Sequence, residues 1–141
     1  MIPVFNESEC LPEVLEELVA ELDRGLKRGY EVLVVDDGST DQTAQVAAQV
    51  AKAHPVIRVF RHSCNSGQSF AFQTGFRHAR GGIVVTLDGD GQNVPADIPA
   101  VVAELGPLCD CCCGYRAQRK DTFWRRLGSR MANNVRNAVL G

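Results

Sequence analysis

The sequence has no long apolar run, no surplus of one charge and few aromatic residues, and each absence excludes a class of protein. No apolar run approaches the roughly 20 residues that a membrane-spanning helix needs. Asn6, Glu7 and Glu9 interrupt any early apolar stretch, which excludes a secretory signal. The chain has 15 Lys and Arg against 17 Asp and Glu, a net charge of −2, and one Trp. Without a basic field or aromatic residues between its basic ones, we expect no nucleic-acid partner.

Two phosphate-binding motifs are also missing. No G-x-G-x-x-G follows any apolar, β-branched run, which argues against the usual dinucleotide fingerprint. The lysine-containing P-loop is absent as well. The sequence shows no internal repeat and no low-complexity linker. If this chain binds a nucleotide, other loops must do so.

Length and composition indicate one globular domain. The 141 residues are 45% hydrophobic and 23% charged, and a chain of this length can bury a real core. We therefore predict a single domain over residues 1–141. Because "MIPVF" begins in the middle of an apparent strand and "NNVRNAVLG" stops without a closing element, we expect a catalytic domain truncated at both ends.

The six cysteines do not predict a metal cluster. Four of them lie in "CDCCC" (109–113), and zinc sites use two separated pairs of ligands. We interpret this stretch, 108–113, as small apolar residues on a buried strand. With no export signal, we expect reduced thiols and a cytoplasmic protein.

Strand and helix patterns alternate along the chain. Apolar, β-branched runs predict strands at 2–5, 30–35, 56–60 and 82–87. Helical periodicity predicts helices from about residue 11 to Gly25, through 43–54, over 70–79, from Pro95 to about 105, and from about Thr122 onwards. Ser39 and Gln42 form a capping-box pattern before the second helix. This alternation predicts a doubly wound, mostly parallel α/β sheet with helices on both faces.

Three polar loops follow predicted strands: "NESE" (6–9), "DDGSTD" (36–41) and "DGDGQN" (88–93). In sheets of this class, ligands bind beyond the carboxyl ends of the strands. We therefore expect the three loops to converge on one site.

The "DGDGQN" loop is suited to a divalent ion. Asp88 and Asp90 offer hard oxygen ligands for Mg²⁺ or Mn²⁺, and Gln92 could add an amide oxygen. An EF-hand is a poor match, because its sixth and twelfth positions would be Asn93 and Pro99. The alternative is a solvent-exposed acidic turn.

Asp36 and Asp37 directly follow a buried strand. Their carboxylates could accept hydrogen bonds from a nucleobase N–H or from ribose hydroxyls. In the alternative reading, Asp37 or Asp41 only caps the next helix.

Basic residues crowd the last quarter of the chain. Arg125 and Ser129 are four residues apart, so on a helix they share one face and could cradle a phosphate. A solvated helix face is the alternative. The basic residues are Arg116, Arg119, Lys120, Arg125, Arg126, Arg130 and Arg136.

Taken in order, these motifs resemble the catalytic domain of family 2 glycosyltransferases with the GT-A fold. The stretches that carry the resemblance are "IPVFNE" (2–7), "VVDDGSTDQT" (34–43), "NSGQSFAFQTGFRHARG" (65–81), "TLDGDGQNVPADIP" (86–99), "GYRAQRKD" (114–121) and "RRLGSRMANNVRN" (125–137). The fourth and fifth stretches are similar to the dolichyl- and undecaprenyl-phosphate sugar transferases, of the dolichol-phosphate mannose synthase type.

The resemblance implies a role for each matching residue. Asp88 and Asp90, with Gln92, would hold the divalent ion on the donor diphosphate, and Arg116 would contact phosphate, so Asp88, Asp90 and Arg116 are the expected catalytic residues. Arg125 and Ser129 would meet the phosphate of the lipid acceptor. The residues expected to bind the UDP- or GDP-linked sugar are Pro3, Val4, Asn6, Glu7, Asp36, Asp37 and Asp88.

The expected reaction is a metal-assisted inverting displacement at the anomeric carbon, with a polyprenyl phosphate as acceptor at the cytoplasmic face of a membrane. A lipid phosphate is already anionic near neutral pH, so it needs no strong general base. No base is evident either, since we interpret His54, His62 and His78 as structural. A hydroxyl acceptor would need a base.

The sequence is compatible with two alternatives. The chain could be an inactive, nucleotide-sugar-binding fragment. It could also be a phosphatase of the haloacid-dehalogenase type, because "TLDGDG" is a strand followed by D-x-D-G. Two departures from the family pattern are Phe5, where Tyr is frequent, and Gly89, where Ala is frequent and which we expect to loosen the turn slightly.

Overall fold

The computed structural model describes residues 1–114. A parallel sheet of three strands lies at its centre, in the order β1-β2-β3. The strands are β1 (Ile2–Val4), β2 (Val32–Asp36) and β3 (Ile57–Arg61). Val34 of β2 lies opposite Ile2 on one side and Val59 on the other. Every residue of β1 and β2 is buried, as continuous apolar runs in a parallel sheet predict.

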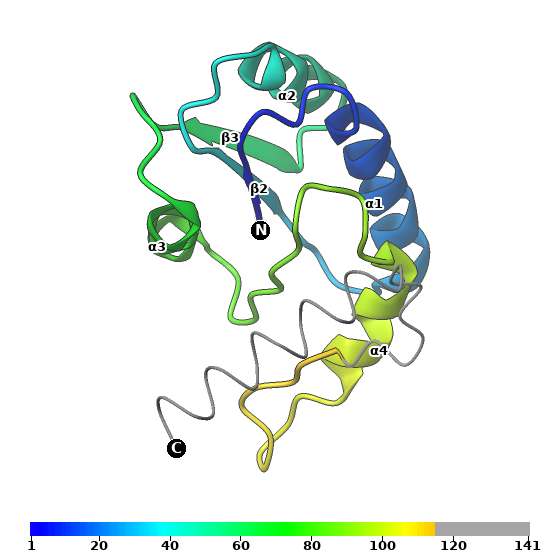
Figure 1. Cartoon of the computed structure of the whole chain (residues 1–141). Helices are drawn as coiled ribbons and strands as arrows, with labels where there is room; N and C mark the ends of the chain where they lie inside the picture. The colour runs from blue at the N-terminus through cyan, green and yellow to red at the C-terminus, as the bar shows by residue number, and fades with distance from the viewer. Residues whose placement is uncertain (115–141) are drawn as a thin grey trace, which may run out of the picture.

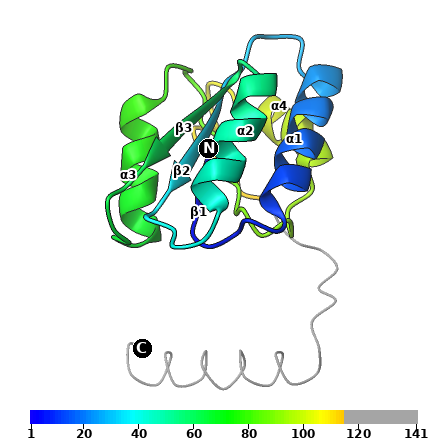
Figure 2. The same cartoon turned by 90° about the horizontal axis from the view of Figure 1, so that it is seen from above.

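Helices cover both faces of the sheet (Figures 1 and 2). Helices α1 (Leu11–Gly25) and α2 (Thr43–Ala53) lie on one face, and α3 (Gln68–His78) packs on β1 and β2 from the other. A short 3₁₀ turn, η1 (Pro95–Asp97), leads into α4 (Ile98–Ala103), and both pack against α1. The predicted α/β architecture with helices on both faces is confirmed. Among residues 1–114, no helix has both the length and the apolar character needed to cross a membrane.

The helical periodicity of the first predicted helix marks its buried side. Five of its apolar residues lie on one side of the helix, towards the sheet, and each is at most 6% exposed. They join Ile2, Val34 and Ile57 in the main core. The five helix residues are Leu11, Leu15, Leu18, Val19 and Leu22.

The prediction of a regular strand over 82–87 is wrong. Two backbone hydrogen bonds connect this segment with β1: the Met1 amine donates to the Val85 carbonyl, and the Leu87 N–H donates to the Met1 carbonyl. Two bonds to one residue do not make a ladder, and Ile83 and Val84 remain 39% exposed. The segment nevertheless runs beside β1 on the side away from β2.

This placement makes β1 the point where the winding of the fold reverses. The chain first steps from β1 to β2 to β3 through α1 and α2 on one face. It then crosses the other face through α3 and returns to the far side of β1 with residues 82–87. In doubly wound folds, ligands bind beyond the carboxyl ends of the strands at this reversal.

The prediction of a buried cysteine strand at 108–113 is also wrong. One isolated antiparallel bridge joins Gly106 and Cys109, and Leu108 is fully exposed. The thiols of Cys111 and Cys113 are exposed as well. Among the described residues no neighbouring strand pairs with this stretch, so its apolar character does not lead to burial.

The capping box predicted for the second helix does not form. Helix α2 starts at Thr43, and no side-chain cap bond is made by Gln42 at its N-cap. The Ser39 hydroxyl instead accepts a hydrogen bond from the Asn6 N–H, 33 residues away. Competition from a tertiary partner therefore overrides the local capping pattern.

Candidate functional site: an acidic cleft where the winding reverses

A cleft of about 500 Å³ opens at the carboxyl end of β1. Its walls come from four segments: β1 with the loop after it, Asp37 directly after β2, the start of α3 with the loop before it, and the "DGD" turn after residues 82–87. This is the place that the reversal at β1 predicts for a ligand. The lining residues are Pro3, Val4, Phe5, Glu7, Asp37, Asn65, Gly67, Gln68, Asp88, Gly89 and Asp90.

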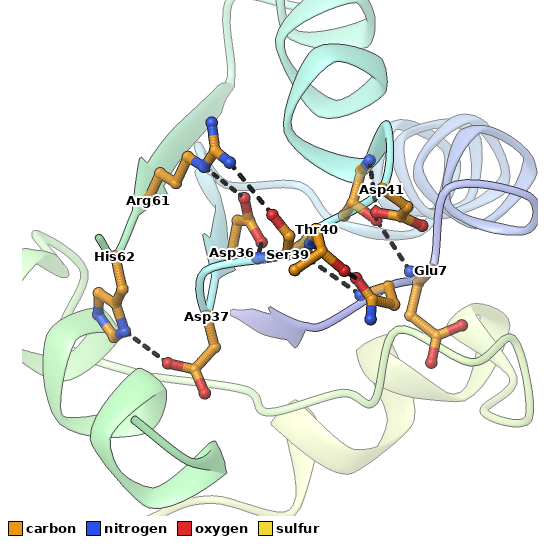
Figure 3. Close-up of polar contacts among 10 residues, drawn as sticks. Glu7, Asp36, Asp37, Ser39, Thr40, Asp41, Arg61 and His62 are labelled. Carbon is orange, nitrogen blue, oxygen red and sulfur yellow. Dashed lines mark hydrogen bonds and ion pairs between the residues drawn. The ribbon is translucent and has the colours of Figure 1, made fainter. Parts of the chain in front are cut away.

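Asn6 locks the first two predicted loops together, and Figure 3 shows Glu7 of the first loop close to Thr40 and Asp41 of the second. The Asn6 N–H donates to the Ser39 hydroxyl at 2.9 Å, and its side-chain oxygen accepts the Thr40 N–H at 2.9 Å. Asn6 has a φ of 57°, a left-handed conformation that asparagine tolerates better than most residues. The residue therefore holds the "DDGSTD" loop against the loop after β1.

A second connection passes through Thr43, the first residue of α2. The Glu7 N–H donates to the Thr43 hydroxyl at 2.9 Å, and this hydroxyl donates to the Asp41 carboxylate at 2.5 Å. Asp41 also accepts the Ser8 N–H. These hydrogen bonds, that of the Thr43 hydroxyl foremost, lower the pKa of Asp41 to about 2. The ionised carboxylate thus fixes the backbone that presents Glu7 to the cleft.

Asp36 is completely buried beneath the loop and does not line the cleft. One carboxylate oxygen accepts the Ser39 N–H at 2.9 Å. The other lies 3.2 Å from Nε of Arg61, which forms an ion pair with it, although the angle is too poor for a hydrogen bond. A buried charge needs such partners, and in this structure they are protein groups.

Asp37 lines the cleft, but its oxygens are occupied by protein donors. It accepts hydrogen bonds from Nδ1 of His62 at 2.7 Å, the Ser66 N–H at 3.0 Å and the Gly67 N–H at 2.7 Å. Burial opposes its ionisation, yet the hydrogen bonds from His62 and the two amides outweigh burial and lower the pKa of Asp37. Asp37 therefore joins the start of α3 to the sheet.

The structural interpretation of His62 agrees with its contacts. While Nδ1 meets Asp37, Nε2 lies 2.9 Å from the Thr74 hydroxyl on α3. The ring also packs edge-on against Phe70. Both nitrogens are engaged within the protein, so His62 positions Asp37 and does not face the cleft as a base.

The "DGD" turn packs against β1 through Gly89. A Cβ added at Gly89 would lie 2.6 Å from Cγ1 of Val4 and 3.4 Å from the Pro3 carbonyl oxygen. The Gly89 carbonyl also lies 3.4 Å from the Cys10 thiol. Burial and the neighbouring Glu7 carboxylate raise the pKa of the Cys10 thiol, so it stays a donor. Contrary to our expectation, glycine here does not loosen the turn but permits its close contact.

Asp88 and Asp90 line the cleft on either side of Gly89. One oxygen of Asp88 accepts Nε2 of Gln68 at 3.1 Å, and one oxygen of Asp90 accepts the Gln92 N–H at 3.0 Å. No hydrogen bond from the rest of residues 1–114 reaches the second oxygen of either carboxylate. The donor set therefore fits Mg²⁺ or Mn²⁺, which bind through one or two carboxylates and keep water and phosphate as their other ligands.

The cleft lining is acidic and has no cation among the described residues. Glu7, Asp37, Asp88 and Asp90 contribute four carboxylates, and none of the eleven lining residues is Lys, Arg or His. Of these four, only Asp37 accepts three hydrogen bonds from protein donors. A diphosphate would be repelled by this surface unless a cation came with it. A divalent ion meets that need, as does a basic residue from beyond residue 114.

The structure brings together six of the predicted site residues in the cleft: Pro3, Val4, Glu7, Asp37, Asp88 and Asp90. Asn6 and Asp36 lie behind it and hold the loops, and Gln92 contributes its backbone N–H to Asp90. Their direct roles stay predictions. Arg116, Arg125 and Ser129 lie outside the described residues. Asn65, Gly67 and Gln68 also line the cleft and were not among the predicted site residues, although their position after the third strand places them at this edge.

A doubly wound α/β sheet with a cleft at its reversal point is the arrangement in which α/β domains of this class bind their ligands. Comparison with models of protein families identifies one family for this chain. The model described as glycosyl transferase family 2 matches residues 1–140, and the chain belongs to this family. Membership rules out the phosphatase interpretation.

The curated relatives include two undecaprenyl-phosphate 4-deoxy-4-formamido-L-arabinose transferases. The protein from Sodalis glossinidius (strain morsitans) is 42% identical over 143 residues, and that from Enterobacter sp. (strain 638) is 38% identical over 144 residues. Each alignment covers all of this chain and 43% of the relative. The chain thus spans less than half the length of these proteins.

Solved structures share the fold. The mannosyltransferase PcManGT from Pyrobaculum calidifontis, in complex with GDP-Man and Mn²⁺, is 30% identical with a TM-score of 0.61, covering 72% of this chain and 30% of that one. S. aureus TarS 1-349 in complex with UDP is 27% identical with a TM-score of 0.55, covering 74% and 31%. The predicted GT-A fold is therefore confirmed.

Proposed function

We propose that this protein transfers a sugar from a UDP- or GDP-linked donor to a polyprenyl phosphate, with undecaprenyl phosphate the first candidate, by an inverting, metal-assisted displacement. The observation that carries the proposal is the cleft itself. It lies at the reversal of the sheet, holds two carboxylates with an unoccupied oxygen each, and lacks a cation of its own among the described residues. Such a surface suits a diphosphate accompanied by a divalent ion.

The relatives support each half of this reaction. Two of them are named as transferases that act on undecaprenyl phosphate. The structural neighbours were solved with GDP-Man and Mn²⁺ and with UDP. These names describe those proteins, and they make a nucleotide sugar and a lipid phosphate the substrates to test here.

The roles of the chain's own residues follow from their places. Asp88 and Asp90 would hold Mg²⁺ or Mn²⁺, which supplies charge neutralisation to the diphosphate leaving group. Pro3 and Val4 would form the floor of the donor site, and Glu7 would line its side. The preorganised turn keeps these groups in place, and preorganisation is usually the largest contribution to catalysis.

The acceptor end depends on residues outside the described part. We assign Arg116 to the donor phosphates, and Arg125 and Ser129 to the phosphate of the lipid acceptor, on their sequence positions. An anionic phosphate acceptor attacks without a general base. A polyprenyl acceptor further places the reaction at a membrane surface, and we propose its cytoplasmic face.

Calorimetric titration of the purified 141-residue chain with UDP, GDP and their sugar conjugates, first with Mn²⁺ and then with EDTA, tests the proposal. We expect one nucleotide to bind, and only with the metal. Asp90→Ala should abolish this binding, while Glu104→Ala, which removes an exposed acid outside the cleft, should not. Arg125→Ala should spare donor binding and impair only acceptor use.

Each outcome has a clear meaning. Metal-dependent binding without turnover would favour the second candidate, an inactive nucleotide-sugar-binding fragment. Equal binding by the Asp90→Ala variant would contradict the metal site. Absence of any nucleotide binding by a folded sample would refute the donor site altogether.

A further inference from the structure

Gln68 is the first residue of α3 and reaches across the cleft to the "DGD" turn. Its side-chain Nε2 donates to Oδ1 of Asp88 at 3.1 Å, and both residues line the cleft. It is the one side chain among residues 1–114 that hydrogen-bonds to either carboxylate of the proposed metal site. No role has been given to it so far.

The contact determines which oxygen of Asp88 remains available. An exposed carboxylate rotates freely about its terminal bond, so either oxygen, or both, could meet a cation. The amide of Gln68 occupies Oδ1 and leaves Oδ2 without a hydrogen bond from the described residues. Because the amide is neutral, it holds the carboxylate without cancelling the charge that a metal needs.

The position of Gln68 is itself fixed by a rigid support. Gly67, with a φ of 92°, is the N-cap residue just before α3, and its N–H donates to the buried carboxylate of Asp37. Asp37 in turn bonds to His62 on the sheet side. A chain of contacts thus extends from His62, just after β3, through Asp37 to the N-cap of α3, and from Gln68 to Asp88.

We propose that Gln68 is a positioning residue of this site: its amide fixes the Asp88 carboxylate so that Oδ2 alone serves the divalent ion that accompanies the donor diphosphate. The inference rests on the proposed function and deepens it. Hydrogen-bond partners of metal-binding carboxylates are worth about 10–100-fold in metal affinity. Since this contact is exposed to solvent, we expect the lower end, about tenfold.

The test uses Gln68→Met, which keeps the length of the side chain and removes the amide. The matched control is Gln73→Met, since Gln73 is an exposed glutamine on the same helix outside the cleft. Mn²⁺ affinity is measured from the electron paramagnetic resonance signal of free Mn²⁺, with UDP or GDP present. We expect Gln68→Met to bind Mn²⁺ about tenfold more weakly and Gln73→Met to match the wild type.

A second measurement follows the contact without any metal. In nitrogen-15 NMR spectra, the side-chain amide signals of Gln68 are those that disappear in Gln68→Met. They should shift in Asp88→Ala and stay in place in Asp97→Ala. Unchanged signals in Asp88→Ala would show that the contact does not form, which overturns the inference.

The two proposals fail in different ways. If the wild-type chain binds Mn²⁺ with a nucleotide and Gln68→Met binds it equally well, the positioning role is wrong and the proposed function stands. If the wild-type chain binds no Mn²⁺ with either nucleotide, the proposed function falls and the positioning role falls with it. Loss of Mn²⁺ binding in both glutamine variants would indicate a general defect of α3 and also overturn the inference.

Discussion

Replacing Gly89 by alanine tests the packing of the candidate site most directly. The added Cβ would lie 2.6 Å from Cγ1 of Val4, whereas ordinary van der Waals contacts lie between 3.4 and 4 Å. Val4 is 3% exposed at the end of β1 and cannot move outwards without disturbing the core. Introducing a methyl group into such a packed place typically costs about 1–3 kcal/mol.

The destabilisation caused by Gly89→Ala should depend on the side chain at position 4, which makes the prediction specific to this contact. Val4→Ala removes the methyl group that the new Cβ would meet, at its own cost of about 2 kcal/mol for the buried methyl groups lost. The double variant should therefore be less destabilised than the sum of the single ones. For residues in direct contact we expect a coupling energy of about 1 kcal/mol or more.

Urea unfolding followed by far-ultraviolet circular dichroism measures all three variants. Gly29→Ala is the control, because nothing lies within 4 Å of a Cβ added there. It should change the free energy of unfolding by less than about 1 kcal/mol, in either direction. If Gly89→Ala is as mild as the control, or if its effect is independent of Val4, the close contact of the turn with β1 is refuted.

Two further predictions concern the carboxylates behind the cleft. The pKa of Asp41 is lowered to about 2 from 3.8, so its contribution to stability is complete well above pH 3.8 and is lost as the pH falls through about 2. Asp41→Asn should unfold at lower urea than the wild type at pH 7, and this difference should shrink as the pH falls below 3.8. A difference that stays constant with pH would contradict this. His62→Ala leaves the buried Asp37 carboxylate with only its two backbone donors. Loss of a hydrogen bond to a charged group predicts about 2 kcal/mol of destabilisation in urea unfolding at pH 7, and a change below about 0.5 kcal/mol would show that the pair contributes little.

Periodic patterns predicted the secondary structure well where burial is one-sided or complete. The spacing of Leu11, Leu15 and Leu22 predicted α1 and its buried side, and the β-branched run before Asp36 predicted β2. Both elements find their partners among the described residues. Residues 82–87 and 108–113 have similarly apolar sequences but lack a complete neighbouring strand there, so neither forms a regular strand. A strand requires a partner that its own sequence does not contain.

The sequence predicted the candidate site only in part, again because the partners of a side chain are not contained in its own local sequence. Asp36 and Asp37 are adjacent and chemically identical, yet one lies buried with Arg61 and the other lines the cleft. The alternation of side chains along a strand predicts that neighbouring residues point to opposite faces of the sheet. It does not predict which residues each of them will contact. The contacts of Ser39 with Asn6 and of Gln68 with Asp88 join residues that are 33 and 20 positions apart, and no local sequence pattern predicts them.

The sequence by itself determined the class of fold, the family, and the loops that line the candidate site, because these depend on hydrophobic periodicity and on motifs in a fixed order. The tertiary structure alone decided which carboxylates face the cleft, which are occupied by protein donors, and that Gly89 is needed for contact with Val4. Such roles depend on distances between segments far apart in the chain. Only the packing of the helices on the sheet sets those distances.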